Sequence, residues 1–414
     1  MQRQRAGVNR RAGVARLSVA MAMALLVVKG ELVEATPESN AAALFLLISP
    51  SVRVNGMGQA GVALPDEPAG YYNPGAAALS SSAHTVQSRL YLSGMQWLPA
   101  WAGITYGHQD VQAMAEGELP ALSWKGPASL AAAVYGYRTR MDLGPLDRIG
   151  DGGGEAGVPD VTDACNSLGV SLALRSFLEV GVGATSKWIS VEFGGTRETV
   201  RAHDFGLMAV APMAGMLQRF TGREIALGQH FRPRLDIGYG IAWHNRGPDI
   251  VYTGALQPDP LPANRRHGWS GSLAMDWQSD AFQITIGKVT LATETYRPQI
   301  EGARVTSLAD DDKRGFEVSI LETISFRRGE YDDFDGEVHL RTSGETVRSD
   351  GLFRYMTHHL ERAPPGTSRD ALLFVARHVS VSWSRFEYDP DWPAEGHSYL
   401  GLSFRSRQPA VSPG

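Results

Sequence analysis

The sequence predicts an all-β fold, a transmembrane antiparallel β-barrel of about 14 strands with an N-terminal hatch, or plug, segment. Apolar residues alternate with small or polar ones over most of the chain. Opposite the apolar residues stand mainly Gly, Ser and Ala, whereas a water-exposed sheet would carry Lys, Glu and Thr there. No apolar run after residue 35 reaches the roughly 18 residues of a membrane helix, so a membrane can be crossed only by strands.

Glycine makes up 46 of the 414 residues, about 11% against an average near 7%. The glycines do not recur every third residue, which excludes collagen, and the tryptophans and β-branched residues along the chain exclude disorder. We expect many of the glycines on the inward strand face, where lumen space is short, and in the hatch. The net charge of -5 gives no basic surface for nucleic acid, so no nucleic-acid partner is predicted.

The first 35 residues predict a signal peptide. Residues 17–28 form an uncharged run after five arginines, and Val33, Glu34 and Ala35 fit a small-x-small cleavage site. An N-terminal anchor is the alternative, although a spanning helix needs roughly 20 residues. Arg10 and Arg11 also leave twin-arginine export open. The chain then divides into a signal peptide (1–35), an N-terminal hatch segment (36–82), a β-barrel (83–407) and a C-terminal tail (408–414).

The alternation predicts which residues face lipid. Leu172 and Ile237 belong to apolar faces, where an arginine would be costly, whereas Gly238 is expected on the lumen face, where serine would be tolerated. Breaker-rich segments at 144–160, 247–266 and 362–370 predict loops, the longer ones extracellular. Strand candidates begin near Val86, Ile104, Leu130, Leu168, Val180, Phe205, Leu235, Trp269, Phe282, Phe316, Glu337, Leu352, Val379 and Ser398.

Tryptophans lie in or beside these candidates, as expected for the aromatic girdles of a membrane barrel. Tryptophans also fill the cores of soluble sandwiches. The competing class is therefore a soluble secreted or periplasmic β-rich binding protein with its apolar faces packed together. The tryptophans are Trp97, Trp101, Trp188, Trp243, Trp269, Trp277 and Trp383.

The segment before the first strand contains a glycine motif. Gly56, Gly58 and Gly61 match GxGxxG, but Pro65 and Pro68 interrupt the helix that a dinucleotide site requires. The glycines permit tight turns and close backbone approach, and Asn before Pro favours a turn. A surface linker is the alternative to a hatch. It would leave the hydrophobic residues 45–48 in water, which favours the hatch.

The same segment resembles the start of the PorV/PorQ family, relatives of the FadL-type outer-membrane transporters. Weaker similarities follow downstream in the expected order, including Lys187 and the run 245–248. The chain departs from the family pattern at Gln59 and Gly75, where Gly and Ala are expected, and over 336–370. The predicted hatch and lumen residues are Gly56, Met57, Gly58, Gly61, Asp66, Asn73 and Pro74.

The resemblance implies a non-enzymatic barrel of about 14 strands in the outer membrane of a Gram-negative-type bacterium, with a hatch inside it. In FadL relatives it implies transport of small hydrophobic ligands, and in the PorV branch a role in type IX protein secretion. The predicted partners are accordingly outer-membrane lipid and either a hydrophobic ligand or type IX components and cargo. No cofactor is predicted.

Other residue groups give no site. The acidic runs 310–312 and 332–335 resemble a calcium loop only superficially, because Tyr331 and Thr342 stand at the first and twelfth ligand positions. The pair His358 and His359 lacks a second ligand pair at useful spacing. No pattern of nucleophile and base or of paired carboxylates stands out, so neither a metal site nor catalysis is predicted.

Overall fold

The structure is a computed structural model that describes residues 41–65, 70–80, 89–95, 105–118, 128–142, 162–193, 196–223, 225–252, 258–279, 282–299, 310–333, 338–388 and 397–404. The predicted signal peptide, the tail 408–414 and Asp66 lie outside the described residues. The strands are β1 (Arg89–Met95), β2 (Thr105–Glu118), β3 (Ser129–Asp142), β4 (Thr162–Arg175), β5 (Glu179–Phe193), β6 (Thr196–Pro212), β7 (Phe231–Arg246), β8 (Asn264–Ser279), β9 (Phe282–Pro298), β10 (Asp311–Ile320), β11 (Ile324–Asp333), β12 (Val338–Arg348), β13 (Val379–Tyr388) and β14 (His397–Phe404). The helices are η2 (Leu44–Leu47), α2 (Val52–Gly56), η4 (Pro74–Ala76), α3 (Met213–Thr221), α4 (Asp350–Arg362) and α5 (Thr367–His378).

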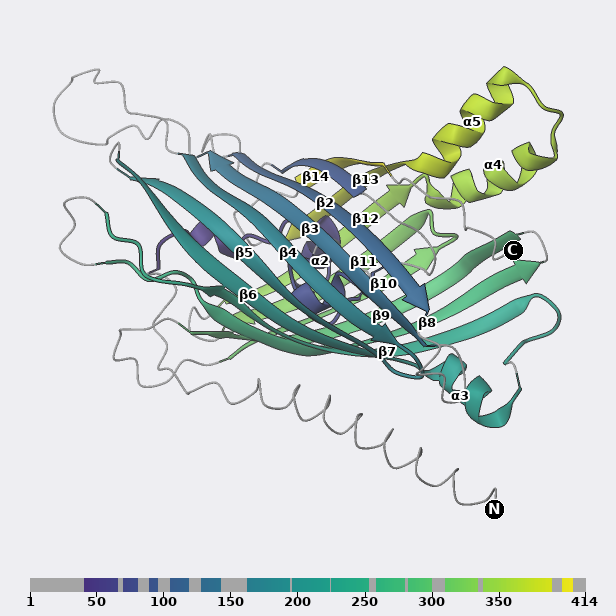
Figure 1. The fold of residues 1–414 in the computed structure, drawn as a ribbon, viewed down its shortest axis with the longest axis horizontal. Coiled ribbons are helices and arrows are strands. Elements are labelled where there is room, and N and C mark those ends of the chain that lie inside the picture. Colours follow the sequence, from purple (N-terminus) through teal and green to yellow (C-terminus); the bar gives the residue numbers. More distant parts are fainter. Residues whose placement is uncertain are drawn as a thin grey trace, which may run out of the picture.

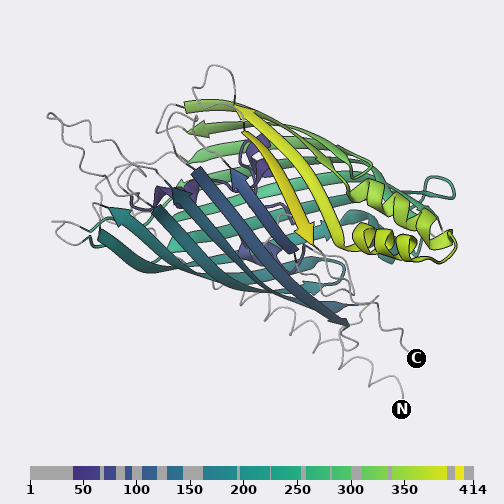
Figure 2. The same cartoon turned by 90° about the horizontal axis from the view of Figure 1, so that it is seen from above.

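The strands form one 14-stranded antiparallel sheet in chain order, and β14 lies beside β1. Figures 1 and 2 show the sheet curved into a tilted barrel. In an antiparallel chain-order barrel, successive connections alternate between the two ends. We call the end that carries α3, α4 and α5, together with the β8–β9 and β10–β11 turns, the helix end, and the opposite end the loop end.

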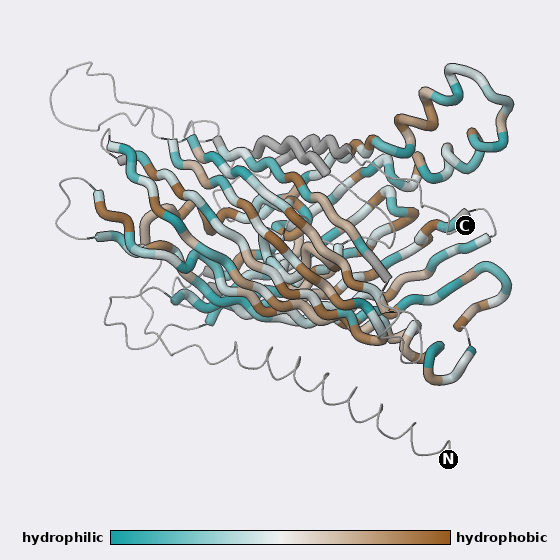
Figure 3. Tube along the Cα trace, in the orientation of Figure 1, coloured by the Kyte–Doolittle hydropathy of each residue, from teal (hydrophilic) through white to brown (hydrophobic). Residues whose placement is uncertain are grey.

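The barrel wall is apolar outside and polar inside. Leu172 and Ile237 keep 51% and 40% of their surface exposed, while Lys187 and Asp204 on neighbouring strands are 3% and 0% exposed. Figure 3 shows the matching alternation of hydrophobic and hydrophilic positions along the strands. A soluble sandwich would have the reverse polarity. The predicted transmembrane barrel is therefore confirmed, and the soluble alternative is wrong.

Replacing Ile237 with arginine should destabilise the barrel by about 2–4 kcal/mol, because the charge would enter the hydrocarbon region. Urea unfolding in lipid vesicles measures the loss. Ile237→Ala is the control, since it shortens the side chain without adding charge. Equal losses for the two variants would contradict the outward placement of this face.

The space for a serine side chain at Gly238 is narrower than the sequence predicts. A Cβ atom built on Gly238 would lie 2.5 Å from Ser270 Oγ and 3.1 Å from the Ala63 carbonyl oxygen. Ser270 Oγ donates a 2.6 Å hydrogen bond to that same carbonyl. Gly238 does face inward, as expected, but the space beside it is already filled by the N-terminal segment.

The predicted strand near Leu352 is also wrong, because residues 350–378 form the helices α4 and α5, which project from the helix end (Figures 1 and 2). Its apolar residues recur at helical spacing, at Leu352, Met356 and Leu360. The predicted loop 362–370 correspondingly shortens, since α5 begins at Thr367. The strand β11 has no counterpart among the candidates. Within the described residues, no helix is both long enough and apolar enough to span a membrane.

The N-terminal residues 41–65 and 70–80, called the hatch below, lie inside the barrel. Phe45 and Ile48 pack in an apolar cluster with residues from the loop-end halves of the strands, such as Tyr106 and Val191. Ala76 to Leu79 pack in a second cluster with residues from the helix-end halves, such as Met114. The hatch therefore contacts both the loop-end and the helix-end halves of the wall from inside the barrel (Figure 1).

Candidate functional site: the hatch and the lumen wall

The Asn73-Pro74 turn sits on a glycine surface of β5, β6 and β7. Asn73 caps η4 by accepting a 2.9 Å hydrogen bond from the Gly75 amide, and its Nδ2 donates to the carbonyls of Val62 and Leu207, each at 3.0 Å. A side chain on the wall glycines would overlap this turn or the Val62 carbonyl beside it. These wall glycines are Gly181 and Gly183 on β5, Gly206 on β6 and Gly240 on β7, the last of which faces Val62.

The Gly56-Met57-Gly58 turn sits on a second glycine surface. Gly315 of β10 and Gly329 of β11 are directly paired across the two strands, and the hatch backbone at Met57 and Gly58 covers both. Gly58 has φ +62°, which favours glycine, and its amide donates a 3.0 Å hydrogen bond to Thr342 Oγ1. Two hatch turns thus approach the wall closely only because the wall has no side chains there.

Between the two turns, a buried carboxylate holds the hatch backbone. Glu294 Oε2 accepts hydrogen bonds from the amides of Gly61 and Val62, each at 2.8 Å. The other carboxylate oxygen lies 3.5 Å from Arg266 Nη1, and the Arg266 guanidinium stands 5.0 Å from the centre of the Tyr296 ring. Glu294 is 2% exposed, so these bonds act in a medium of low polarity.

A second buried carboxylate receives a hatch arginine. Arg53 of α2 approaches Glu317 of β10 in a forked geometry, with Nε 3.0 and 3.1 Å from the two carboxylate oxygens and Nη2 2.9 Å from one of them. Arg327 of β11 reaches the same carboxylate at 2.5 Å and donates to Thr346 Oγ1 at 2.7 Å. This network joins the hatch to three consecutive strands.

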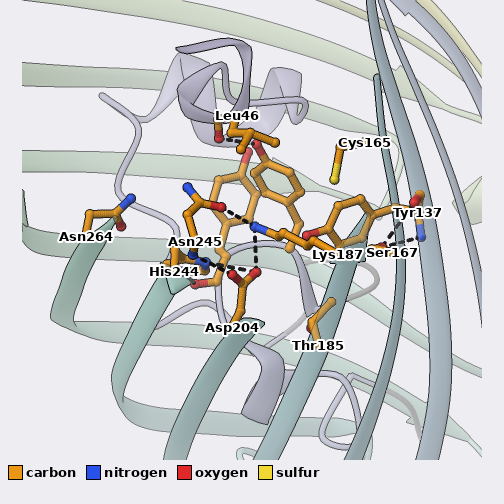
Figure 4. A network of polar contacts seen from close by, with 12 residues as sticks. Leu46, Tyr137, Cys165, Ser167, Thr185, Lys187, Asp204, His244, Asn245 and Asn264 are labelled. Atoms are coloured by element: carbon orange, nitrogen blue, oxygen red, sulfur yellow. Dashed lines mark hydrogen bonds and ion pairs between the residues drawn. The ribbon is translucent and has the colours of Figure 1, made fainter. Parts of the chain in front are cut away.

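A third network centres on Asp204 of β6 (Figure 4). Its carboxylate lies 2.7 Å from Lys187 Nζ and 3.3 Å from His244 Nδ1, and it accepts a 2.8 Å hydrogen bond from the Asn245 amide. His244 Nε2 lies 3.0 Å from the carbonyl oxygen of Tyr72, so the ring connects the carboxylate with the hatch. Lys187 Nζ also donates to Asn245 Oδ1 at 2.7 Å.

Toward the loop end, an apolar cluster lies against the side of the wall made by β2 to β6 and β13. Phe45 is 1% exposed, and its cluster includes Tyr137, Ile189 and Phe386 from the wall. Tyr71 fixes the hatch backbone there by donating to the carbonyls of Leu46 and Ile48, at 3.1 and 2.9 Å. Burial raises the pKa of Tyr71 above its usual value, so the phenol keeps the proton that it donates.

Six of the seven residues predicted for the hatch motif lie inside the lumen, and Asp66 is not described. The carboxylates that hold the hatch are not among the predicted residues. The sequence signal that could have identified them is a charged residue at an inward position of an alternating strand, as at Asp204 and Glu294. The described part of the chain contains no group of three or more His, Cys, Asp or Glu side chains able to hold a metal ion.

No protein-family model matches the chain, and no curated protein does. Among solved structures, the Pseudomonas putida toluene transporter TodX is 9% identical, with 86% of this chain and 96% of that chain covered and a TM-score of 0.34. A deltaS2 mutant of the TodX monoaromatic hydrocarbon channel is 8% identical, with 87% of this chain and 99% of that chain covered and a TM-score of 0.39. A mutant of the Rhodopseudomonas blastica porin is 10% identical, with 78% of this chain and 99% of that chain covered and a TM-score of 0.29. The barrel architecture of this chain follows from its own strand order and wall polarity.

Proposed function

We propose that the protein is an outer-membrane β-barrel of FadL-like type that passes small hydrophobic molecules through a lumen gated by the hatch. The outer membrane of a Gram-negative-type bacterium is the membrane in which bacterial barrels with an even strand number reside. The proposal depends chiefly on one observation. On the side of β2 to β6 and β13, the loop-end half of the lumen contains an apolar cluster, and Phe45 and Leu46, which pack into it, belong to the hatch and not to the wall.

The hatch makes apolar contacts with the wall at one place and carboxylate contacts at another. At the loop end, the side chains of Phe45 and Leu46 make apolar contacts that a hydrophobic ligand can replace, and the Leu46 backbone is held there by the Tyr71 hydroxyl. Around Gly61 and Arg53, by contrast, the wall holds the hatch through buried carboxylates. Displacement of the first part alone would open an apolar chamber. In this proposal the glycine turns and the Asn73-Pro74 turn keep the rest of the hatch in place.

The test uses an apolar dye, N-phenyl-1-naphthylamine, with glucose as a polar reference. Replacing Val191 and Val200 with threonine keeps the shape of the chamber but adds two hydroxyls. Each unpaired hydroxyl in an apolar site costs about 1–3 kcal/mol, so dye binding should weaken by about tenfold or more. Dye fluorescence titration and uptake into vesicles measure the effect.

The matched control replaces Val170 and Val182 with threonine, because both are exposed on the outward faces of β4 and β5. This variant should bind the dye as the unmodified protein does. Equal weakening in the two variants would count against a chamber inside the lumen. Glucose uptake as fast as dye uptake would identify a general pore instead of a hydrophobic transporter.

A role as an outer-membrane component of type IX protein secretion is the second candidate, implied by the PorV resemblance. The α4–α5 hairpin offers a surface for a secretion partner, since Leu352, Tyr355 and Phe374 on it are exposed. Replacing residues 350–378 with a short turn separates the two roles. Loss of secretion with normal dye uptake would favour the secretion role, whereas unchanged secretion would refute a contribution of the hairpin.

A further inference from the structure

The helix α3, which joins β6 to β7 at the helix end, leaves three large apolar side chains exposed. Met213, Leu217 and Phe220 are 38%, 49% and 66% exposed. They stand at positions i, i+4 and i+7 of the helix, so they share one face. Gln218 points to the opposite side of the helix and is exposed as well. The helix α3 is therefore amphipathic, and its apolar face is open to the surroundings.

The start of α3 lies at the level of lipid-facing residues of the wall. The strand β6 ends at Pro212, which pairs with Asp236 of β7. One residue closer to the helix end, Leu235 is exposed on the same outward face as Ile237. The strand β7 extends past this level to Phe231, and α3 contacts both β6 and β7. The helix thus begins beside the outer wall and not beyond its rim (Figure 1).

Aromatic residues mark the membrane boundary near the same place. Phe231 of β7 and Trp277 of β8 are directly paired, and the Trp277 ring lies 5.6 Å from the His230 ring. Phe231 is exposed, as is Leu227 in the segment that joins α3 to β7. Aromatic rings on the outer wall of a membrane barrel sit at the level of the lipid headgroups. The helix α3 therefore leaves the wall between the lipid-facing Leu235 and this boundary.

The apolar face of α3 also continues the outward face of β6. Phe205 and Leu207 belong to that outward face, and the same alternation leads on to Met213. A protein partner could reach this height only by displacing lipid from the wall. The nine-residue helix is about 14 Å long and cannot cross a hydrocarbon core of about 30 Å. A short amphipathic helix at this level lies in the plane of the membrane interface.

We propose that α3 is an interfacial anchor helix, which lies in the lipid leaflet around the helix end with Met213, Leu217 and Phe220 among the acyl chains. Burial of apolar surface stabilises this position. Charge is not required, since Arg234 beside the helix is already paired with Asp236 and Asp276, at 3.4 and 3.3 Å. The anchor is independent of the proposed transport through the lumen, because it lies on the other side of the wall.

Spin-label spectroscopy of the full chain in vesicles of dimyristoyl phosphatidylcholine tests the placement. Cys165 is replaced by alanine, and a nitroxide label is attached to Leu217→Cys. Oxygen concentrates among acyl chains and a nickel chelate stays in water, so the two relaxing agents report the depth of the label. Oxygen should relax the label at position 217 more strongly than the nickel chelate does. Leu172→Cys supplies the reference value for the lipid-facing wall.

The matched control is Gln218→Cys, the neighbouring residue on the polar side, where the nickel chelate should be the stronger agent. Phe220→Cys, a second position on the apolar face, should behave as Leu217→Cys does. Heat-dependent mobility on a gel shows that each variant is folded before it is compared.

Stronger relaxation by nickel at both 217 and 220, or equal behaviour at 217 and 218, would overturn the proposal. Loss of the oxygen preference in high salt would also contradict it, because the contact would then depend on charge. Spin–spin broadening at position 217 that disappears when labelled chains are diluted with unlabelled ones would assign this face to a second copy of the chain instead.

Discussion

Gly329→Val should drive the Met57-Gly58 turn of the hatch away from the wall. A Cβ atom at position 329 would overlap the Gly58 amide nitrogen and the Met57 carbonyl carbon. Neither can yield without moving the hatch backbone, so the 3.0 Å hydrogen bond from the Gly58 amide to Thr342 would be lost as well. Overpacking of this kind costs about 1–3 kcal/mol. The larger effect should be on access to the lumen.

Two measurements detect displacement of the Met57-Gly58 turn from the wall. Planar-bilayer conductance should rise in the variant, and a thiol at Val54→Cys, which is buried in the unmodified protein, should react faster with a small maleimide. The only native thiol, Cys165, is replaced by alanine for this test. Gly271→Val is the control, because no atom lies within 4 Å of a Cβ built there. Identical conductance and labelling in the two valine variants would mean that the glycine surface does not position the hatch.

Asp204→Ala should destabilise the protein by about 3–5 kcal/mol, because it leaves Lys187 buried without a counter-charge. The same change removes the acceptor for the Asn245 amide and the carboxylate beside His244. His244 in turn supports the hatch through the Tyr72 carbonyl. Urea unfolding in vesicles gives the loss of stability, and the maleimide assay above shows whether the hatch loosens.

A double variant separates charge from packing. Lys187→Met in the Asp204→Ala background should recover much of the loss, since no buried charge then remains. Asp142→Ala is the surface control, because its partner Arg140 has a side chain 54% exposed, and such pairs contribute about 0–1 kcal/mol. If the double variant is no more stable than Asp204→Ala alone, the Lys187 charge is not the cause.

The predicted number of strands agrees with the structure, but one predicted strand is absent and one observed strand was not predicted. The candidate near Leu352 is helical, and β11 was missed. β11 escapes the alternation rule because charged residues occupy both of its faces, with Arg327 inward and Arg328 outward. Such a strand lacks the apolar face on which the prediction depends. Where one face is continuously apolar, as on β4 and β7, the predicted orientation of Leu172 and Ile237 is confirmed.

The inward placement of the wall glycines was predictable from the sequence, but the hatch contacts that require them were not. Small inward residues were expected because a lumen is crowded, and Gly183, Gly206 and Gly315 do face inward. What crowds them is the hatch backbone, and no local rule links residue 315 with residue 57. The two departures from the family pattern have physical counterparts. Gln59 adopts φ +64°, which explains why glycine is expected there, and a Cβ on Gly75 would already lie 2.7 Å from the Gly181 carbonyl oxygen.

The charge networks could not be predicted from the sequence, because each joins residues far apart in the chain. Arg53 and Glu317 are 264 positions apart, and Gly61 and Glu294 are 233 positions apart. Alternation gives the face on which each side chain lies, but register and barrel closure decide which inward residues meet.

The position of the hatch has a consequence for the order of assembly. The hatch is made before any strand, yet its partners Glu294, Glu317 and His244 lie on strands that are made later. A wall that closed at the β1–β14 seam around an empty interior would bury these groups without partners. We therefore expect the segment to be in place when the sheet closes. A chain synthesised without it should fail to close, which differs from displacing it in a finished barrel.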